Sequence, residues 1–231
     1  MSSPASSPLT RPATHTLSEA ESKAFLEPFG VSIAPERVVV TAEAAVAAAE
    51  EIGWPVVAKL CGDTIAHKTE RGLVRLHLTG ADATRQAAQS LLDAALPDDG
   101  EVGVLVAAMI SGTRELIAGV ARDPQFGLTV MVGIGGVLAE AIGDVAVGLV
   151  PITTADAHEM IDALESVALL GEFRGEPAVD REALAAVLVA LSDAAASNPA
   201  VHSIDLNPLI IANGTPIAVD ALVELTTEGT R

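Results

Sequence analysis

The feature that most constrains this chain is an apolar segment that ends in a lysine just before a short loop. Residues 54–60 read as a buried strand, and Lys59 lies near its end. The following loop carries His67 and Lys68, and Gly72 lets the backbone approach a ligand closely. A lysine neutralises phosphate oxygens, and a neutral imidazole is a nucleophile at physiological pH. The pattern therefore predicts a strand and loop that bind a polyphosphate and accept its terminal phosphoryl group.

Each of these residues also has a plainer interpretation. Lys59 alone fits a strand-end lysine whose charged end reaches water. His67 alone fits a solvated loop histidine. Their combination with Lys68 favours a phosphate site, because neighbouring cations would stabilise a phosphorylated imidazole and keep the free imidazole neutral.

A second candidate site lies near the C-terminus, where Asp205 and Asn207 stand two residues apart. In an extended strand both side chains point to one face, and their oxygens suit a hard Mg²⁺ ion. A strand end with an Asx-turn before a proline explains the pair equally well. Glu140 follows a long apolar run and adds a carboxylate, whereas Asp220 is either a further ligand or a simple turn aspartate.

Composition and charge exclude several classes of protein. The formal net charge of -18 argues against nucleic acid and anionic membranes as partners, because both attract basic surfaces. The longest apolar run, 126–139, contains four glycines and is too short to cross a bilayer. One cysteine, Cys61, excludes an internal disulfide framework and fits a cytoplasmic protein.

Expected strands and helices are mixed, without regular alternation in the second half of the chain. This mixture predicts an α+β fold rather than a doubly wound sheet. Ser111 and Gly112 interrupt the pattern and predict a hinge. Helices are expected from a capping box at Ser18 and Glu21, and at 41–53, 82–95, 155–169 and 181–196. Strands are expected at 37–40, 54–60, 72–78, 102–110, 115–121, 128–132, 144–149, 201–206, 209–212 and 217–219.

Seven segments of the chain stand in the order in which one known family carries them: LSEAESKAFLEPFGV, GWPVVAKL, AHKTERGLV, TRELIAGVARDPQFG, MVGIGGVLAEAIGDV, LLGEFRGEP and IDLNPLII. The similarity to that family covers residues 17–225. The chain thus resembles the ATP-grasp domain of the NDP-forming acyl-CoA synthetases. This is the β-subunit type of ADP-forming acetate–CoA ligase, related to the β chain of succinyl-CoA synthetase.

The resemblance implies an ATP-grasp fold, in which two α+β subdomains hold ATP between them. The reaction it implies converts an acid, CoA and ATP to acyl-CoA, ADP and phosphate, through an acyl phosphate and a phosphohistidine. Residues 1–16 are rich in Ser, Pro and Thr and are expected to be a disordered tail. For the rest of the chain we expect an N-terminal helix over 17–32 that packs on the second subdomain, a lid-type first subdomain over 33–111, a second subdomain over 112–225 and a tail over 226–231.

The resemblance also implies roles for individual residues. Lys59 and His67 would be the catalytic residues, with Lys59 on the ATP phosphates and His67 relaying a phosphoryl group. ATP would be bound by Lys59, Lys68, Val106, Ala108, Glu115 and Arg122. Magnesium would be held by Asp205, Asn207 and Glu140.

Four positions, in three parts of the chain, depart from the family pattern. Leu73 replaces a second glycine after the His67 segment, and Gly148 stands where a basic residue often follows the second-subdomain carboxylates. Ala107 and Ala108 replace polar side chains near adenine, so adenine recognition is expected from backbone groups.

The chain is too short to carry the rest of such an enzyme. We therefore expect an α-type partner subunit that supplies the CoA-binding and phosphohistidine domains, and through which CoA and the carboxylic acid bind. Two alternatives stay open: a non-catalytic nucleotide-binding regulatory module, and another ATP-grasp carboxylate ligase that uses no phosphohistidine.

Overall fold

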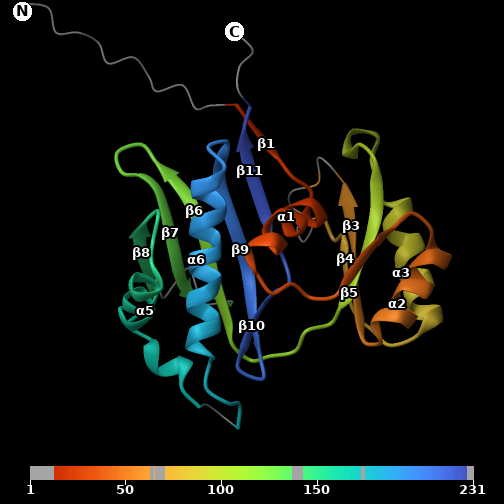
Figure 1. The fold of residues 1–231 in the computed structure, drawn as a ribbon. Coiled ribbons are helices and arrows are strands. Elements are labelled where there is room, and N and C mark those ends of the chain that lie inside the picture. The colour runs from red at the N-terminus through yellow and green to blue at the C-terminus, as the bar shows by residue number, and fades with distance from the viewer. Residues whose placement is uncertain (1–12, 63–64, 66–70, 137–142, 173–174, 228–231) are drawn as a thin grey trace, which may run out of the picture.

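The structure, a computed structural model, describes residues 13–62, 65, 71–136, 143–172 and 175–227. Within these residues the chain forms two sheets that lie side by side (Figure 1). The smaller sheet has the order β2 (Glu36–Val39), β5 (Val102–Ala108), β3 (Val56–Gly62) and β4 (Val74–Leu78). The larger has the order β1 (Thr14–Thr16), β11 (Leu222–Thr226), β9 (Val201–Ala212), β6 (Glu115–Asp123), β7 (Gly127–Ile134) and β8 (Val145–Leu149), with β10 (Thr215–Ala218) paired to β9.

The smaller sheet packs one face against α2 (Ala42–Ile52) and α3 (Ala81–Asp93). The Thr41 side chain accepts a hydrogen bond from the Ala44 N–H at 3.1 Å and begins α2, as the sequence predicts. Alternate residues of β3, among them Val56 and Leu60, join this apolar core. The side chains between them, including Lys59, therefore face away from the helices.

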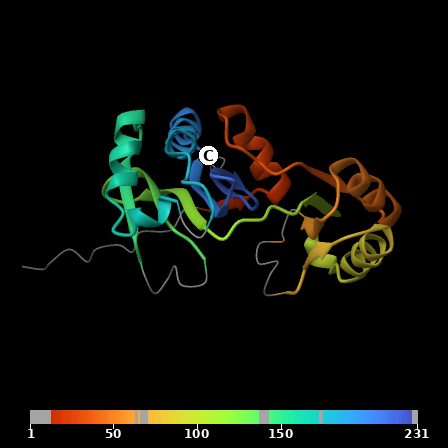
Figure 2. The ribbon, with the colours of Figure 1, turned by 90° about the horizontal axis from the view of Figure 1, so that it is seen from below.

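The larger sheet packs one face against α1 (Glu19–Leu26), α5 (Thr154–Asp162) and α6 (Arg181–Ser197). Figure 2 shows these three helices on the same side of that sheet. Together they enclose the larger of the two apolar cores. The capping box at the start of α1 is confirmed: the Ser18 hydroxyl accepts a hydrogen bond from the Glu21 N–H at 3.3 Å, and the Ser18 N–H donates to Glu21 Oε2 at 2.9 Å. No helix within the described residues is both long and apolar enough to span a bilayer.

Three short 3-10 helices complete the described elements: η1 (Glu27–Phe29), η2 (Pro97–Asp99) and η3 (Val167–Leu170). The helix expected over 155–169 is divided into α5, which ends at Asp162, and the separate helix η3. The Asp144 carboxylate accepts hydrogen bonds from the N–H groups of Glu165 and Ser166 at 2.9 and 2.7 Å. These two amides are therefore not available to continue α5.

Three strands of the larger sheet, β1, β11 and β9, differ from the sequence-based expectation. Residues Thr14–Thr16, which the sequence analysis assigned to a disordered tail, form β1 and pair antiparallel with β11. Strand β11 itself was not expected. The two strands expected at 201–206 and 209–212 are one continuous strand, β9, because β6 pairs with it on both sides of Asn207.

Candidate functional site

A cavity of about 470 Å³ lies between the two sheets, and both subdomains contribute to its walls. One wall is the helix-free face of the smaller sheet, with Val57 and Ala107. The opposite wall comes from the larger sheet, with Pro208 and Ile210. The connection between β5 and β6, where the sequence predicts a hinge, closes one side. The middle of the cavity is therefore apolar, which suits a flat aromatic ring.

Charged side chains lie at the margins of this cavity. Lys59, Glu115 and Asp220 line it, each from a different element or loop. The Glu115 carbonyl also accepts a hydrogen bond from the Gly135 N–H at 2.8 Å. A Cβ at residue 135 would lie 3.0 Å from the backbone of Glu115, so glycine allows this close approach.

Lys59 is the buried cation of the site, with 8% of the residue exposed. Its Nζ donates to Glu19 Oε1 at 2.7 Å and to the Val219 carbonyl at 2.9 Å. Asp220 Oδ2 lies 3.9 Å away. An ammonium has three N–H donors. The described residues accept two of them, which leaves one for a ligand in the cavity.

Asp205 and Asn207 are both exposed on β9, whereas Leu206 between them is buried. This alternation confirms that the two polar side chains share a face of the sheet. Desolvation raises the pKa of the Asp205 carboxyl, and the negative charge of Asp220 raises it further. Two carboxylates that repel each other, next to an amide oxygen, form a donor set that fits a hard divalent cation.

No group of three or more His, Cys, Asp or Glu side chains gathers at metal-binding spacing in the part of the chain that the structure describes. The fit to a cation therefore depends on Asp205, Asp220 and the Asn207 amide. Asp220 was only an alternative in the sequence analysis, because a loop residue after a short strand has no pattern that fixes its direction. Glu140 lies outside the described residues.

The structure brings some of the other expected ATP-binding residues to the cavity and not others. Ala108 and Glu115 line it. Val106 belongs to the core beneath α2 and α3, on the opposite face of β5. Arg122 lies seven residues along β6 from Glu115, or roughly 23 Å at strand spacing. Its guanidinium donates to the carbonyls of Pro199 and Val201 at 3.3 and 3.0 Å.

Two of the expected phosphate-site residues, His67 and Lys68, lie outside the described residues. Residues on either side of them are anchored. Ile65 and Leu73 are buried in the smaller core, and the Leu60 N–H donates to the Leu73 carbonyl at 3.0 Å. The leucine that departs from the family pattern is therefore a packing residue.

Gly148, the second departure, faces α5 and not the cavity. A Cβ at this position would lie 2.8 Å from Met160 Sδ and 3.2 Å from a methyl carbon of Ile152. A basic side chain here would enter the packed layer between β8 and α5. Its absence consequently removes no contact from the cavity described above.

Two backbone N–H groups near the hinge already donate hydrogen bonds within the protein. The Ala108 N–H donates to the Pro35 carbonyl at 2.9 Å, and the Met109 N–H donates to the Pro55 carbonyl at 3.0 Å. Recognition of a ring in the cavity by backbone groups would therefore need other atoms of this connection.

Glu19 is the site residue that sequence reasoning missed. It is 1% exposed and contacts Lys59 across 40 positions of sequence. The capping box places Glu19 in the first turn of α1, but a helical pattern alone does not show which strand that turn faces. The sequence therefore carries no signal that singles out Glu19 as a partner of Lys59.

Comparison with known proteins shows several close similarities. A model of the ATP-grasp domain matches residues 9–225. The β subunit of an ADP-forming acetate–CoA ligase from Pyrococcus furiosus is 37% identical over 208 residues, which is 89% of this chain and 90% of that protein. An ADP-forming acetate–CoA ligase from Archaeoglobus fulgidus is 36% identical over 203 residues, 87% of this chain but 30% of its own length.

A solved structure also matches. It is acetyl-coenzyme A synthetase 1 from Ca. Korarchaeum cryptofilum, in complex with coenzyme A and Mg-AMPPCP, with a phosphohistidine segment pointing towards the nucleotide binding site. The TM-score is 0.77 at 35% sequence identity, over 90% of this chain and 91% of that one.

Proposed function

This chain belongs to the ATP-grasp family, as a homologue of the β subunits of ADP-forming acetate–CoA ligases, and we propose that it is the ATP-binding subunit of an acyl-CoA synthetase. The reaction is the conversion of a carboxylic acid, CoA and ATP to acyl-CoA, ADP and phosphate. The observation that carries the proposal is the cavity between the sheets, which the buried Lys59 and the Asp220 carboxylate both line, with Asp205 within the electrostatic reach of Asp220.

The cavity residues divide the work of binding ATP. The apolar walls around Val57, Ala107 and Ile210 accept the adenine ring. Lys59 gives its remaining N–H to a phosphate oxygen. Such a charge-assisted hydrogen bond both orients the phosphate chain and neutralises its charge.

Magnesium fits beside Asp220, at the margin of the cavity. Asp205 and Asn207, with Asp220 beside them, would hold the ion. A bound Mg²⁺ would neutralise negative charge that develops on the phosphates during transfer. The described residues keep the Asp205 and Asp220 carboxylates close together and hold Lys59 Nζ 3.9 Å from Asp220 Oδ2.

We further propose that the γ-phosphoryl group passes to a histidine, with His67 as the relay in this chain, and that an α-type subunit completes the reaction. That subunit would carry the CoA-binding and phosphohistidine domains. Two relatives support an α-type partner. The Pyrococcus furiosus protein is named as a β subunit, and in the Archaeoglobus fulgidus protein the matching region is 30% of a longer single chain.

The test combines the chain with its α-type subunit, γ-labelled ATP and Mg²⁺. We expect label that is stable in base and labile in acid, as on a phosphohistidine. Lys59→Ala should lower ATP turnover by about two orders of magnitude, because one charge-assisted contact to the phosphates is lost in a site that excludes water.

Three results would contradict parts of this proposal. Unchanged turnover in Lys59→Ala would remove Lys59 from the phosphate site. Tight ATP binding without transfer would favour a regulatory nucleotide-binding module. Full activity of His67→Asn would favour a carboxylate ligase without a phosphohistidine.

A further inference from the structure

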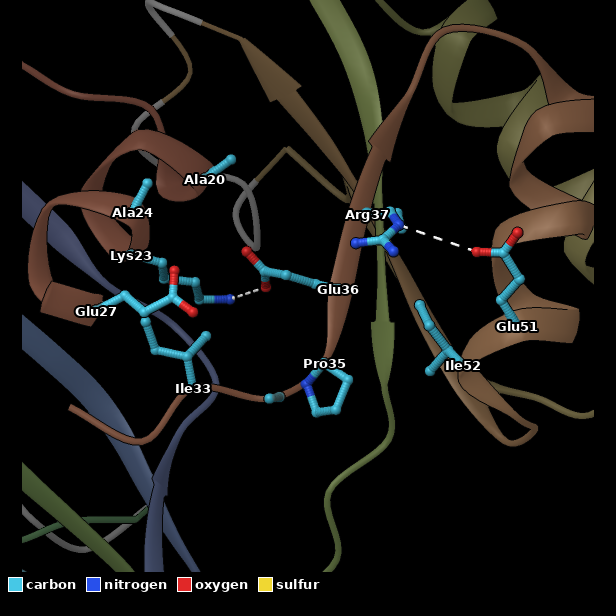
Figure 3. A pocket seen from close by; sticks show the side chains of 11 residues that line it. Ala20, Lys23, Ala24, Glu27, Ile33, Pro35, Glu36, Arg37, Glu51 and Ile52 are labelled. Atoms are coloured by element: carbon cyan, nitrogen blue, oxygen red, sulfur yellow. Dashed lines mark hydrogen bonds and ion pairs between the residues drawn. The ribbon is translucent and has the colours of Figure 1, made fainter. Parts of the chain in front are cut away.

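A buried network of four charged side chains lies behind the cavity. It joins Glu19 and Lys23 of α1 to Glu36 of β2 and Lys59 of β3. Lys23 and Glu36 also line a second cavity of about 610 Å³ on the other side of the network, where their ion pair is visible (Figure 3). Glu19 and Lys23 are 1% and 2% exposed.

The two lysines of the network differ in how many of their donors are used. Lys23 Nζ donates to Glu19 Oε1 at 2.8 Å, to Glu36 Oε2 at 2.6 Å and to the Val219 carbonyl at 3.2 Å. These three bonds use all three N–H groups of Lys23. Within the described residues Lys59 uses two of its three, and both acceptors, Glu19 and the Val219 carbonyl, are shared with Lys23.

Glu19 Oε1 is the atom that both ammonium groups contact, at 2.8 and 2.7 Å. A lysine side chain has four rotatable bonds, so an unrestrained Lys59 would sample many positions in the cavity. Two acceptors on the same side fix its Nζ. They also direct the third N–H away from α1, towards the space where the phosphates would lie.

We propose that Glu19 is a positioning residue that aims Lys59 at the phosphates of the nucleotide. This inference rests on the proposed function, because it takes ATP as the ligand of the cavity. Glu19 does not line the cavity, so it would act on the nucleotide through Lys59. It belongs to the helix of the larger subdomain, whereas Lys59 belongs to the smaller sheet, so the phosphate contact depends on both subdomains.

The test measures what the phosphates add to affinity, as the ratio of the dissociation constants for adenosine and for ATP with Mg²⁺. Glu19→Gln keeps the shape of the side chain but removes its charge. We expect ATP to bind about tenfold more weakly, the effect of one misdirected charge-assisted hydrogen bond, while adenosine binding changes less than about twofold. Damage to the fold would weaken both ligands together.

Glu36→Gln is the matched control. It makes the same chemical change in the same buried network, but Glu36 bonds to Lys23 and not to Lys59. We expect it to lower thermal stability and to leave the adenosine-to-ATP ratio unchanged. If Glu19→Gln does not fold, Glu19→Asp serves instead, because it keeps the charge but withdraws the carboxylate by one methylene, and the ratio should still fall.

A double-mutant cycle with Lys59→Met shows whether Glu19 acts through Lys59. The double variant should bind ATP as Lys59→Met alone does, since no further loss is possible once the lysine is gone. Additive losses would overturn the inference, as would equal or tighter ATP binding by Glu19→Gln. If Lys59→Met itself binds ATP normally, the proposed function fails at this residue, which is a distinct outcome.

Discussion

At the scale of single residues, the candidate site holds the carboxylates of Asp205 and Asp220 close enough to repel each other, which lowers the stability of the fold. The raised pKa of Asp205 means that its ionised form is less favourable in the folded chain than in the unfolded chain. Ionisation of Asp205 therefore lowers stability above its ordinary pKa of 3.8, and this cost disappears as the pH falls below the ordinary value. A bound cation would remove the repulsion from Asp220.

Asp205→Asn should consequently have opposite effects on the free chain and on the liganded chain. Without ligand at pH 7, we expect a melting temperature equal to or a few degrees above that of the wild type, because the repulsion is gone. With Mg²⁺ and ATP, we expect most of the ligand-induced rise in melting temperature to be lost. Asp123→Asn, at the remote turn, is a control for loss of one charge. A lower melting temperature without ligand would contradict this account.

A second residue-scale prediction concerns the ion pair next to the His67 segment. Arg71 donates to both oxygens of Asp99 at 2.6 and 2.9 Å, and the Leu96 N–H donates to the same carboxylate at 2.8 Å. These hydrogen bonds lower the pKa of Asp99 from 3.8 to about 2. The stability that the ionised carboxylate contributes is therefore present above pH 4 and is lost as the pH falls from about 4 to about 2.

We expect Asp99→Asn to lower the free energy of unfolding at pH 7. The difference from the wild type should shrink when urea unfolding is repeated at successively lower pH below 4. Asp82→Asn removes the partner of Arg85 in a fully exposed ion pair and should change little at any pH. A difference for Asp99→Asn that stays constant down to pH 2 would show that the charge is not the source of the effect.

At the scale of secondary-structure elements, residue 148 of β8 faces α5, where a Cβ would lie 2.8 Å from Met160 Sδ. We expect Gly148→Lys to destabilise the chain by about 1–3 kcal/mol through overpacking against α5. It should not tighten ATP binding, although family members often carry a basic residue in this neighbourhood. Chemical denaturation and ATP titration measure the two effects. Val147→Lys, on the exposed face of the same strand, should be tolerated.

The helices and strands also show which parts of the fold local sequence patterns could predict. Caps and apolar periodicity placed α2, α6 and most strands within a few residues, because these signals are local. The early end of α5 was not predictable, since its cause is the carboxylate of Asp144, outside the helix. Strand β9 was divided at a proline because proline weakens a strand pattern, yet pairing with β6 continues past it.

The residues of the candidate site likewise fall into those that a local sequence pattern predicts and those that depend on tertiary contacts. Lys59 and the Asp205–Asn207 pair could be found because each follows from the period of one strand. Glu19 could not, because its role appears only when α1 meets β3. The predicted ATP contacts of Val106 and Arg122 came from resemblance alone, and the positions of these residues in the fold give them no direct place in the cavity.

At the scale of the whole molecule, the chain has two apolar cores, one per subdomain, and the cavity lies between them. A ligand that contacts both walls binds the folded arrangement of both subdomains. Two ion pairs of the buried network, Glu19–Lys59 and Lys23–Glu36, cross from α1 to the smaller sheet.

We therefore expect Mg²⁺ with a non-hydrolysable ATP analogue to slow amide hydrogen exchange in β3 and β5 as well as in β9. At one hundred times the dissociation constant, ligand binding should add about 2.7 kcal/mol to the free energy of unfolding. Lys59→Met should lose the protection in β3 and β5 more than that in β9. Protection confined to one sheet in the wild type would contradict a ligand site shared by both subdomains.

The pairing of β1 with β11 has a further consequence for assembly. Thr14–Thr16 lie beside Glu224–Thr226, and the Thr227 N–H bonds to the Ala13 carbonyl at 2.9 Å. Both ends of the described chain therefore leave the molecule at one corner (Figure 1). A neighbouring domain joined by a short linker would start from the same point whether it preceded or followed this one. Gene fusion in either order would then give nearly equivalent geometry, and a circular permutant closed at this corner should retain the fold.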